Sequence, residues 1–241
     1  MSGVRVVAMD MDGTITQHRT PLGEENRQTL DRLSAYYRLV IVGAGTCARI
    51  RKQLDDYPLD IIGNYGMQAG ATDAASGGFH VVEDYRAASP DRERVLDTAA
   101  ALRQKYGYTR FDGDSVEFHD SGMMTFALLG TKAPIEEKLA FDPLRIKRFP
   151  MYKDVCAAFD AYTVFIGGSS SFDIVPAPYT KLYALDRYCN RFGYRRGDIV
   201  YFGDDYGVGG NDAHVFHSDI RFVTMRSYED FPVMASFLLV R

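Results

Sequence analysis

The stretch between residues 4 and 14 constrains the fold of this sequence most strongly. An apolar, β-branched run over residues 4–9 ends on two carboxylates, Asp10 and Asp12, and Gly13 follows as a turn residue. A buried strand that ends in this way delivers its carboxylates to the C-terminal edge of a parallel sheet, where open α/β sheets bind ligands. Two adjacent carboxylates repel each other unless a cation or a proton lies between them. We therefore interpret the stretch as a metal site with one carboxylate free to attack an electrophile, the alternative being an Asp-Gly turn in which Asp12 caps the next segment.

Short apolar runs alternate with helical segments at both ends of the chain. The apolar runs predict strands at residues 4–9, 39–42, 59–62, 199–202 and 220–223. Helical spacing of apolar residues predicts helices at residues 24–37, 47–54 and 180–192 and near the C-terminus. This alternation implies right-handed crossover connections and a parallel sheet.

The middle of the chain has a different pattern. We predict a helix at 90–106 with Ser89 as its N-cap, hairpins at 115–118/123–129 and 163–166/171–175, and a helical stretch at 142–159 broken at Pro150. The predicted fold class is α/β, a Rossmann-like parallel-sheet core with an inserted α+β cap domain that contains an antiparallel sheet. We place the catalytic core at residues 1–80 and 179–241 and the cap at 81–178.

Composition narrows the function classes. The chain has 241 residues, a formal net charge of −4 and a pI near 5.7, which argue against a nucleic-acid partner. Three widely spaced cysteines (Cys47, Cys156 and Cys189) suit reduced thiols rather than a disulfide framework or a zinc site. The sequence shows neither a signal peptide nor a membrane-spanning segment, so we expect a soluble, cytoplasmic protein with no membrane partner.

A second group of candidate catalytic and metal-binding residues follows the predicted cap domain. Asp204 ends a predicted strand, and Asp212 begins a short helix, where it could hold a metal-bound water or act only as an N-cap. Mg²⁺ prefers hard oxygen ligands, and Asp10 and Asp204 at neighbouring strand ends would supply them. Lys181, at the start of a helix, is most simply a solvated lysine. At a phosphate site it would be the counter-charge to the transferred group.

The segment Gly43-Ala44-Gly45-Thr46 opens a helix, and its backbone N–H groups could bind an anion. With Ala48 it also matches the dinucleotide fingerprint, so an NAD-dependent oxidoreductase is a competing hypothesis. That hypothesis has only Asp60 as a loosely spaced ribose-binding residue and leaves the strand-end carboxylates unexplained. We therefore rank it low.

The order and spacing of these residues resemble the successive motifs of the haloacid dehalogenase-like (HAD) phosphotransferase superfamily. The matching segments are Asp10-Met11-Asp12-Gly13-Thr14, Lys181, Gly203-Asp204-Asp205 and Gly209-Gly210-Asn211-Asp212. Within that superfamily the whole chain resembles the eukaryotic-type phosphomannomutases, which carry a large α/β cap. The nearest further match in sequence is the segment at residues 165–174.

The resemblance implies roles for individual residues. Asp10 would be the nucleophile that forms an aspartyl-phosphate, and Asp12 the general acid/base, whose backbone carbonyl completes an Mg²⁺ site with Asp10 and Asp204. Lys181 and the helix N-terminus at Thr46 would bind phosphate. Strict alignment puts Gly45 where the mutases have serine, so Thr46 would take that role. The substrate would be a small phosphorylated molecule such as a sugar phosphate, contacted by Arg19, Ser171 and Asp173.

The reaction depends on positions where this chain departs from the family. The mutases hold a second phosphate with several cap arginines, whereas the corresponding residues here are His119, Thr131 and Lys138. A charged hydrogen bond is worth about 1.5–3 kcal/mol, so losing two would cost roughly a hundredfold in affinity for a distal phosphate. We therefore predict a sugar-phosphate phosphatase, with a hexose phosphate mutase as the alternative and a non-catalytic phospho-ligand sensor ranked last. The resembling family implies a monomer or a homodimer through the cap.

Overall fold

The computed structural model describes residues 3–73 and 76–240, which form two compact units. The core unit comprises Met1–Tyr85, Thr180–Gly207 and Asp212–Arg241. The cap unit comprises Arg86–Tyr179 and Val208–Asn211.

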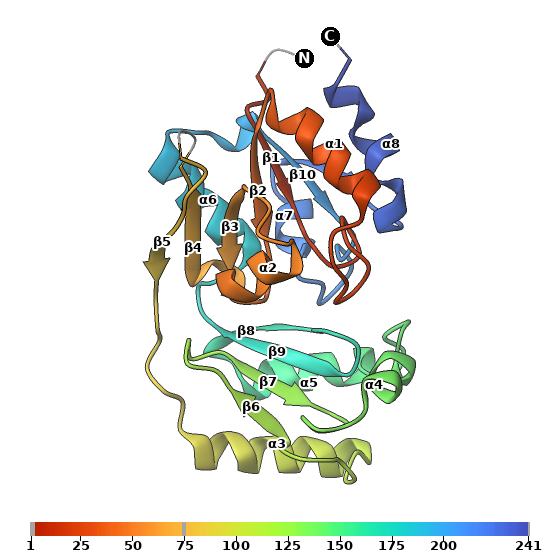
Figure 1. Cartoon of the computed structure of the whole chain (residues 1–241). Helices are drawn as coiled ribbons and strands as arrows, with labels where there is room; N and C mark the ends of the chain where they lie inside the picture. Colours follow the sequence, from red (N-terminus) through yellow and green to blue (C-terminus); the bar gives the residue numbers. More distant parts are fainter. Residues whose placement is uncertain (1–2, 74–75, 241) are drawn as a thin grey trace. The chain divides into compact units, whose positions relative to one another are not determined.

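The core unit is built on a seven-stranded sheet in the order β11-β10-β1-β2-β3-β4-β5 (Figure 1). Its strands are β1 (Val6–Met9), β2 (Arg38–Val42), β3 (Asp60–Gly63), β4 (Gln68–Thr72), β5 (Phe79–Asp84), β10 (Ile199–Gly203) and β11 (Arg221–Thr224). Strands β11 through β3 are parallel, and β4 and β5 add an antiparallel edge. The central strand β1 therefore pairs with β2 on one side and with β10, from the far end of the chain, on the other.

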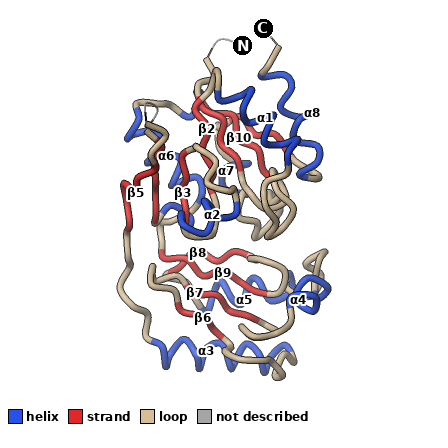
Figure 2. The backbone as a smooth tube through the Cα atoms, in the orientation of Figure 1, coloured by secondary structure: helices blue, strands red, loops and turns tan. Residues whose placement is uncertain are grey.

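Helices cover both faces of this sheet (Figure 2). They are α1 (Glu24–Ser34), α2 (Cys47–Gln53), α6 (Lys181–Phe192), α7 (Ala213–Phe216) and α8 (Phe231–Ala235). Val7 and Met9 pack with α1, α2 and α8, whereas Val6 and Ala8 pack with α6 and α7. Because successive strand residues point to opposite faces, β1 is buried on both and forms the centre of a three-layer core.

The cap unit is a four-stranded antiparallel sheet in the order β6-β7-β9-β8 with helices on one face. Its elements are α3 (Arg92–Tyr106), β6 (Val116–Phe118), β7 (Met124–Ala127), α4 (Ile135–Phe141), α5 (Phe149–Ala158), β8 (Tyr162–Phe165) and β9 (Ser171–Pro176). Phe126 and Phe172 lie on neighbouring strands and pack against α3 and α5. Thr125 and Asp173 form the next cross-strand pair, which alternation places on the opposite face.

This architecture confirms the predicted fold class, and two local predictions were wrong. The core unit extends to Tyr85, five residues beyond the boundary placed near residue 80, because β5 pairs with β4. Asp91, not Ser89, caps α3, since its side chain accepts from the backbone N–H of Arg94. Pro150 does not break a helix but occupies the first turn of α5, where its missing N–H costs nothing. The preceding helix ends at Phe141, before the predicted stretch begins.

The three cysteines are free thiols, with Cys47 and Cys189 buried. Across the described residues, the helices are too short or too polar to cross a membrane.

Candidate active site

The register of β1 and β10 places the two predicted strand-end carboxylates side by side. Met9 pairs with Phe202, and the backbone N–H of Asp10 donates to the carbonyl of Phe202 at 2.9 Å. Asp10 follows β1 directly, and Asp204 follows β10. The carboxyl ends of the two central strands thus bring together residues that are almost 200 positions apart in sequence.

Lys181 is fully buried, contrary to the simple expectation of a solvated lysine at a helix start. It is the first residue of α6, whose N-cap Thr180 accepts a hydrogen bond from the backbone N–H of Tyr183. The Nζ of Lys181 donates to Asp10 Oδ1 at 2.6 Å and to Asp212 Oδ1 at 2.8 Å. A buried ammonium requires such partners, so Lys181 fixes the orientation of the Asp10 carboxylate.

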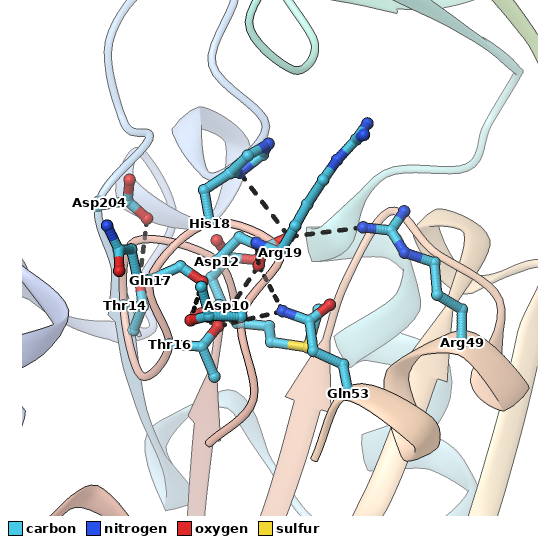
Figure 3. Close-up of polar contacts among 12 residues, drawn as sticks. Asp10, Asp12, Thr14, Thr16, Gln17, His18, Arg19, Arg49, Gln53 and Asp204 are labelled. Carbon is cyan, nitrogen blue, oxygen red and sulfur yellow. Dashed lines mark hydrogen bonds and ion pairs between the residues drawn. The ribbon is translucent and has the colours of Figure 1, made fainter. Parts of the chain in front are cut away.

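Asp204 is held by the turn that follows β1. The hydroxyl of Thr14 donates to Asp204 Oδ1 at 2.9 Å, as Figure 3 shows. Gly13 has a positive φ of 92°, and a Cβ at this position would lie 2.5 Å from Asp204 Oδ2. Residue 13 must therefore be glycine both for its backbone conformation and for the close approach of Asp204.

Asp212 is buried behind Asp10 and Lys181. Its Oδ1 accepts from the hydroxyl of Tyr201 at 2.6 Å and from Lys181, and its Oδ2 accepts from the backbone N–H of Asp205 at 3.0 Å. It occupies the N-cap position of α7, but its side chain makes no cap hydrogen bond there. Of the two roles considered from the sequence, the geometry disfavours the simple N-cap.

The charges in this cluster are unbalanced. Asp10, Asp204 and Asp212 each place a carboxylate oxygen within 4.8 Å of the others, and Lys181 supplies one positive charge between them. Burial, reinforced by the other two carboxylates, raises the pKa of Asp10 well above its usual range despite Lys181. Burial and the charge of Asp212 raise the pKa of Asp204 to about 6. Burial acts to lower the pKa of Lys181, but Asp10 and Asp212 outweigh it and raise that pKa.

The donor set fits a hard divalent cation. The cluster consists of carboxylate oxygens, which Mg²⁺ prefers, and it carries more negative than positive charge. A bound cation would relieve the repulsion that raises the pKa of Asp204. Asp12 is predicted to bind the metal through its backbone carbonyl, and its carboxylate lies outside this group of described residues.

We predict that stabilisation by Mg²⁺ weakens as the pH falls through about 6. Without metal, the folded-state pKa of Asp204 is higher than its value of 3.8 in an unfolded chain. Asp204 therefore destabilises the metal-free fold increasingly as the pH rises from 3.8 to about 6, and Mg²⁺ relieves this by binding the ionised form. At about one hundred times the Kd, stabilisation should approach roughly 2.7 kcal/mol at high pH.

Thermal unfolding with Mg²⁺ and with chelator, across the pH range on both sides of 6, measures this effect. Asp204→Asn is the control, in which the part of the pH dependence that is centred near 6 should disappear. An Mg²⁺ effect of equal size on both sides of pH 6 would contradict the assignment of Asp204 as a ligand.

Asp12 belongs to a separate network on the other side of the loop (Figure 3). Its Oδ1 accepts from Gln53 Nε2 at 2.7 Å, from the backbone N–H of Arg19 at 2.9 Å and from the hydroxyl of Thr16 at 3.4 Å. Its Oδ2 faces Arg49 Nη2 at 3.6 Å and His18 Nδ1 at 3.9 Å. Asp10 and Asp12 therefore have different partners, as two carboxylates with different chemical roles require.

The predicted phosphate-binding turn is present in the core unit. Thr46 is the N-cap of α2, and its hydroxyl accepts from the backbone N–H of Arg49 at 3.1 Å. The side chain of Arg49 lies over Gly45, since a Cβ at Gly45 would lie 3.3 Å from Arg49 Cδ. Phosphate binding by Gly45 and Thr46 remains a prediction.

Arg19, a predicted substrate residue, has a positive φ of 59°, and its backbone N–H donates a hydrogen bond to Asp12.

The predicted substrate residues Ser171 and Asp173 lie on β9 of the cap unit. A buried arginine, Arg148, organises the loop before them by donating to the carbonyls of Gly167, Gly168 and Ser171. Ser171 also donates to the carbonyl of Gly167 at 3.1 Å. Their contact with a substrate remains a prediction.

The three cap positions that replace family arginines take part in contacts within the cap unit. His119 Nε2 lies 3.0 Å from the hydroxyl of Thr125, which donates to Asp173 Oδ1 at 3.4 Å. The hydroxyl of Thr131 accepts from the backbone N–H of Asp114 at 2.9 Å, and Lys138 Nζ donates to the carbonyl of Thr131 at 2.8 Å.

Asp60 does not have the freedom that dinucleotide binding would require. It is only 2% exposed and accepts two hydrogen bonds from Arg38, one from the Tyr188 hydroxyl and one from the backbone N–H of Thr72. A carboxylate so engaged is not available to a ribose hydroxyl, which removes the main support for the oxidoreductase hypothesis.

Polar residues near the site that were missed from the sequence include Thr16, His18, Arg49, Gln53 and Tyr201. Arg49 and Gln53 carried a signal, because their four-residue spacing places both on one face of α2. Tyr201 reads as an ordinary apolar strand residue, and only the fold shows that its hydroxyl reaches Asp212.

Comparison with known proteins agrees with this geometry. A family model described as "Eukaryotic phosphomannomutase" matches residues 108–230, just over half of the chain. The phosphomannomutase of Saccharomyces cerevisiae is 28% identical over 219 residues, covering 88% of this chain and 84% of that protein. The phosphomannomutase of Encephalitozoon cuniculi is 25% identical over 247 residues, covering 93% and 90%.

Solved structures support the fold. A haloacid dehalogenase-like hydrolase from Bacteroides thetaiotaomicron superposes with a TM-score of 0.56 and 13% identity, covering 98% of both chains. The IMP-bound IMP-nucleotidase of Plasmodium falciparum superposes with a TM-score of 0.70 and 12% identity, covering 97% of this chain and 68% of that one. The chain is thus a phosphoryl-transfer enzyme of the haloacid dehalogenase-like superfamily and belongs to the eukaryotic phosphomannomutase family.

Proposed function

We propose that this protein moves a phosphoryl group between positions of a hexose phosphate through a phosphorylated Asp10. The observation that carries the proposal is the buried Lys181, which bonds Asp10 and Asp212 beside Asp204. Relatives named phosphomannomutase support this function better than the hydrolysis that the sequence favoured. The proposal therefore adopts the alternative of the two reactions considered above.

The reaction divides into two displacements. A carboxylate oxygen of Asp10 attacks phosphorus and forms an O–P bond, while the bond between phosphorus and the sugar oxygen breaks. Asp12 donates a proton to the departing oxygen and later removes one from the hydroxyl group that takes the phosphoryl group. Lys181 holds Oδ1 of Asp10 and offsets charge on the phosphoryl oxygens. A covalent intermediate replaces one difficult step by two easier ones.

Asp10, Asp204 and the backbone carbonyl of Asp12 would hold Mg²⁺, with Asp212 orienting a metal-bound water. When bound, the ion would neutralise the charge that develops on the phosphoryl oxygens. Gly45 and Thr46 would bind the phosphate, and Arg19, Ser171 and Asp173 the sugar. A cytoplasmic location, and a monomer or cap-mediated homodimer, remain part of the proposal.

Hydrolysis is the second candidate, and the cap unit supplies the reason to keep it. Thr131 accepts from the backbone N–H of Asp114, and Lys138 donates to the carbonyl of Thr131, so neither side chain supplies the fork of an arginine. Neither replaces the bidentate geometry with which arginine holds a phosphate. A doubly phosphorylated intermediate would then be retained weakly, and water would reach the aspartyl-phosphate.

Phosphorus NMR of mannose 1-phosphate in the presence of Mg²⁺ distinguishes the two reactions. We expect mannose 6-phosphate to accumulate faster than inorganic phosphate, with a rate that increases when a hexose bisphosphate is added. A mutase needs the bisphosphate to rephosphorylate Asp10, whereas a hydrolase does not. Release of inorganic phosphate without any mannose 6-phosphate would show that the enzyme is a hydrolase. If no phosphate ester that is tested changes, both the mutase and the hydrolase function are contradicted.

A further inference from the structure

The two oxygens of Asp12 have different surroundings. Oδ1 accepts three hydrogen bonds, the shortest of which, at 2.7 Å, comes from the side chain of Gln53. The side chains facing Oδ2, those of Arg49 and His18, lie at 3.6 and 3.9 Å, beyond hydrogen-bond distance. Figure 3 shows Gln53 and Arg49 approaching Asp12 from α2, while His18 approaches from the loop after β1.

Gln53 is well placed to fix Asp12. It is the last residue of α2, one turn after Arg49, and its neighbours Ile50 and Leu54 are fully buried and hold the helix against the sheet. Its amide also donates to the hydroxyl of Thr16 at 3.3 Å. Two of the three partners of Oδ1, the amide of Gln53 and the backbone N–H of Arg19, can only donate, so this oxygen acts as a hydrogen-bond acceptor toward both.

We propose that Gln53 is the positioning residue for proton transfer in this enzyme. By occupying Oδ1, Gln53 makes Oδ2 the oxygen of Asp12 that carries the proton. Oδ2 then gives the proton to the departing sugar oxygen and accepts one from the attacking hydroxyl. The inference rests on the proposed function, because it assigns the geometry of the acid/base step in phosphoryl transfer from and to Asp10.

Leaving groups that differ in their need for a proton provide the test. p-Nitrophenolate departs as a stabilised anion and needs no general acid, whereas the sugar oxygen of a hexose bisphosphate does. Rapid-quench measurement of aspartyl-phosphate formation follows this first step in either a mutase or a hydrolase. The variants are Gln53→Met, which is similar in size but lacks the donor, and Gln53→Asn, which withdraws the amide by one methylene group. Gln28→Met is the matched control, since Gln28 is an exposed residue of α1 that bonds Glu24.

Both Gln53 variants should phosphorylate Asp10 from a hexose bisphosphate about tenfold more slowly or worse, the effect of one hydrogen bond to a charged group. With p-nitrophenyl phosphate the change should be less than about twofold, and Gln28→Met should change neither rate. Equal losses with both substrates would assign Gln53 a merely structural role, and unchanged rates would exclude it from the reaction. If wild-type protein forms no aspartyl-phosphate with either substrate, the proposed function itself fails.

Discussion

Replacing Asp10 with asparagine should reduce phosphoryl transfer by about 10⁴-fold or more. Asparagine has nearly the same shape but lacks the anionic oxygen that forms the bond to phosphorus. The substitution also removes one of three clustered carboxylates, so the fold should remain, since the remaining pair of Asp212 and Lys181 is charge-balanced. Loss of activity would therefore report loss of the nucleophile and not unfolding.

Acid-quenched reactions with radiolabelled substrate measure both turnover and the covalent intermediate. Asp31→Asn is a suitable control, because Asp31 is an exposed carboxylate on α1 that accepts from the Tyr57 hydroxyl. The control should keep its label and its rate. A stable phosphoryl-protein adduct in Asp10→Asn, at a rate near that of the wild type, would show that another residue is the nucleophile.

Replacing Lys181 with methionine should destabilise the metal-free protein by about 3–5 kcal/mol. Lys181 is fully buried and bonds both Asp10 and Asp212, so its removal leaves two buried carboxylates without their positive partner. Activity should fall by roughly a hundredfold or more as well, because a charge that faces the transferred phosphoryl group is lost.

Urea unfolding in the presence of chelator measures the loss of stability. In the presence of Mg²⁺ the loss should be smaller, because the positive charge of the ion partly replaces that of Lys181. The double variant Lys181→Met with Asp212→Asn should be more stable than Lys181→Met alone, since one uncompensated carboxylate has been removed. If the double variant were no more stable, the loss would come from packing and not from charge.

Much of the core and its site could be predicted because strong local patterns determine them. The all-apolar run of β1 ends on Asp10, and the second run ends near Asp204, so a parallel sheet must bring both carboxylates to one edge. That topology also explains why Lys181, at the start of a later helix, meets them.

What could not be predicted depends on tertiary contacts. Pro150 disfavours the interior of a helix but suits its first turn, and no local signal shows where α5 begins. The bond between Gln53 and Asp12 joins residues 41 positions apart, and the bond between Tyr201 and Asp212 needs the exact course of the loop after β10. The roles of Gln53 and Tyr201 depend on hydrogen-bond partners that are distant in sequence, and the periodicity of the sequence does not identify those partners.

The strand order also has a consequence for synthesis on the ribosome. β1 is made first, but its neighbour β10 begins only at Ile199, after the long cap segment Arg86–Tyr179. At about 5–20 residues per second, one edge of the most apolar strand stays without its native partner for on the order of 10–40 s. During that interval the nascent chain presents an open strand edge, the surface from which aggregation starts. The catalytic centre and the protection of that edge arise in the same late event, when β10 docks beside β1.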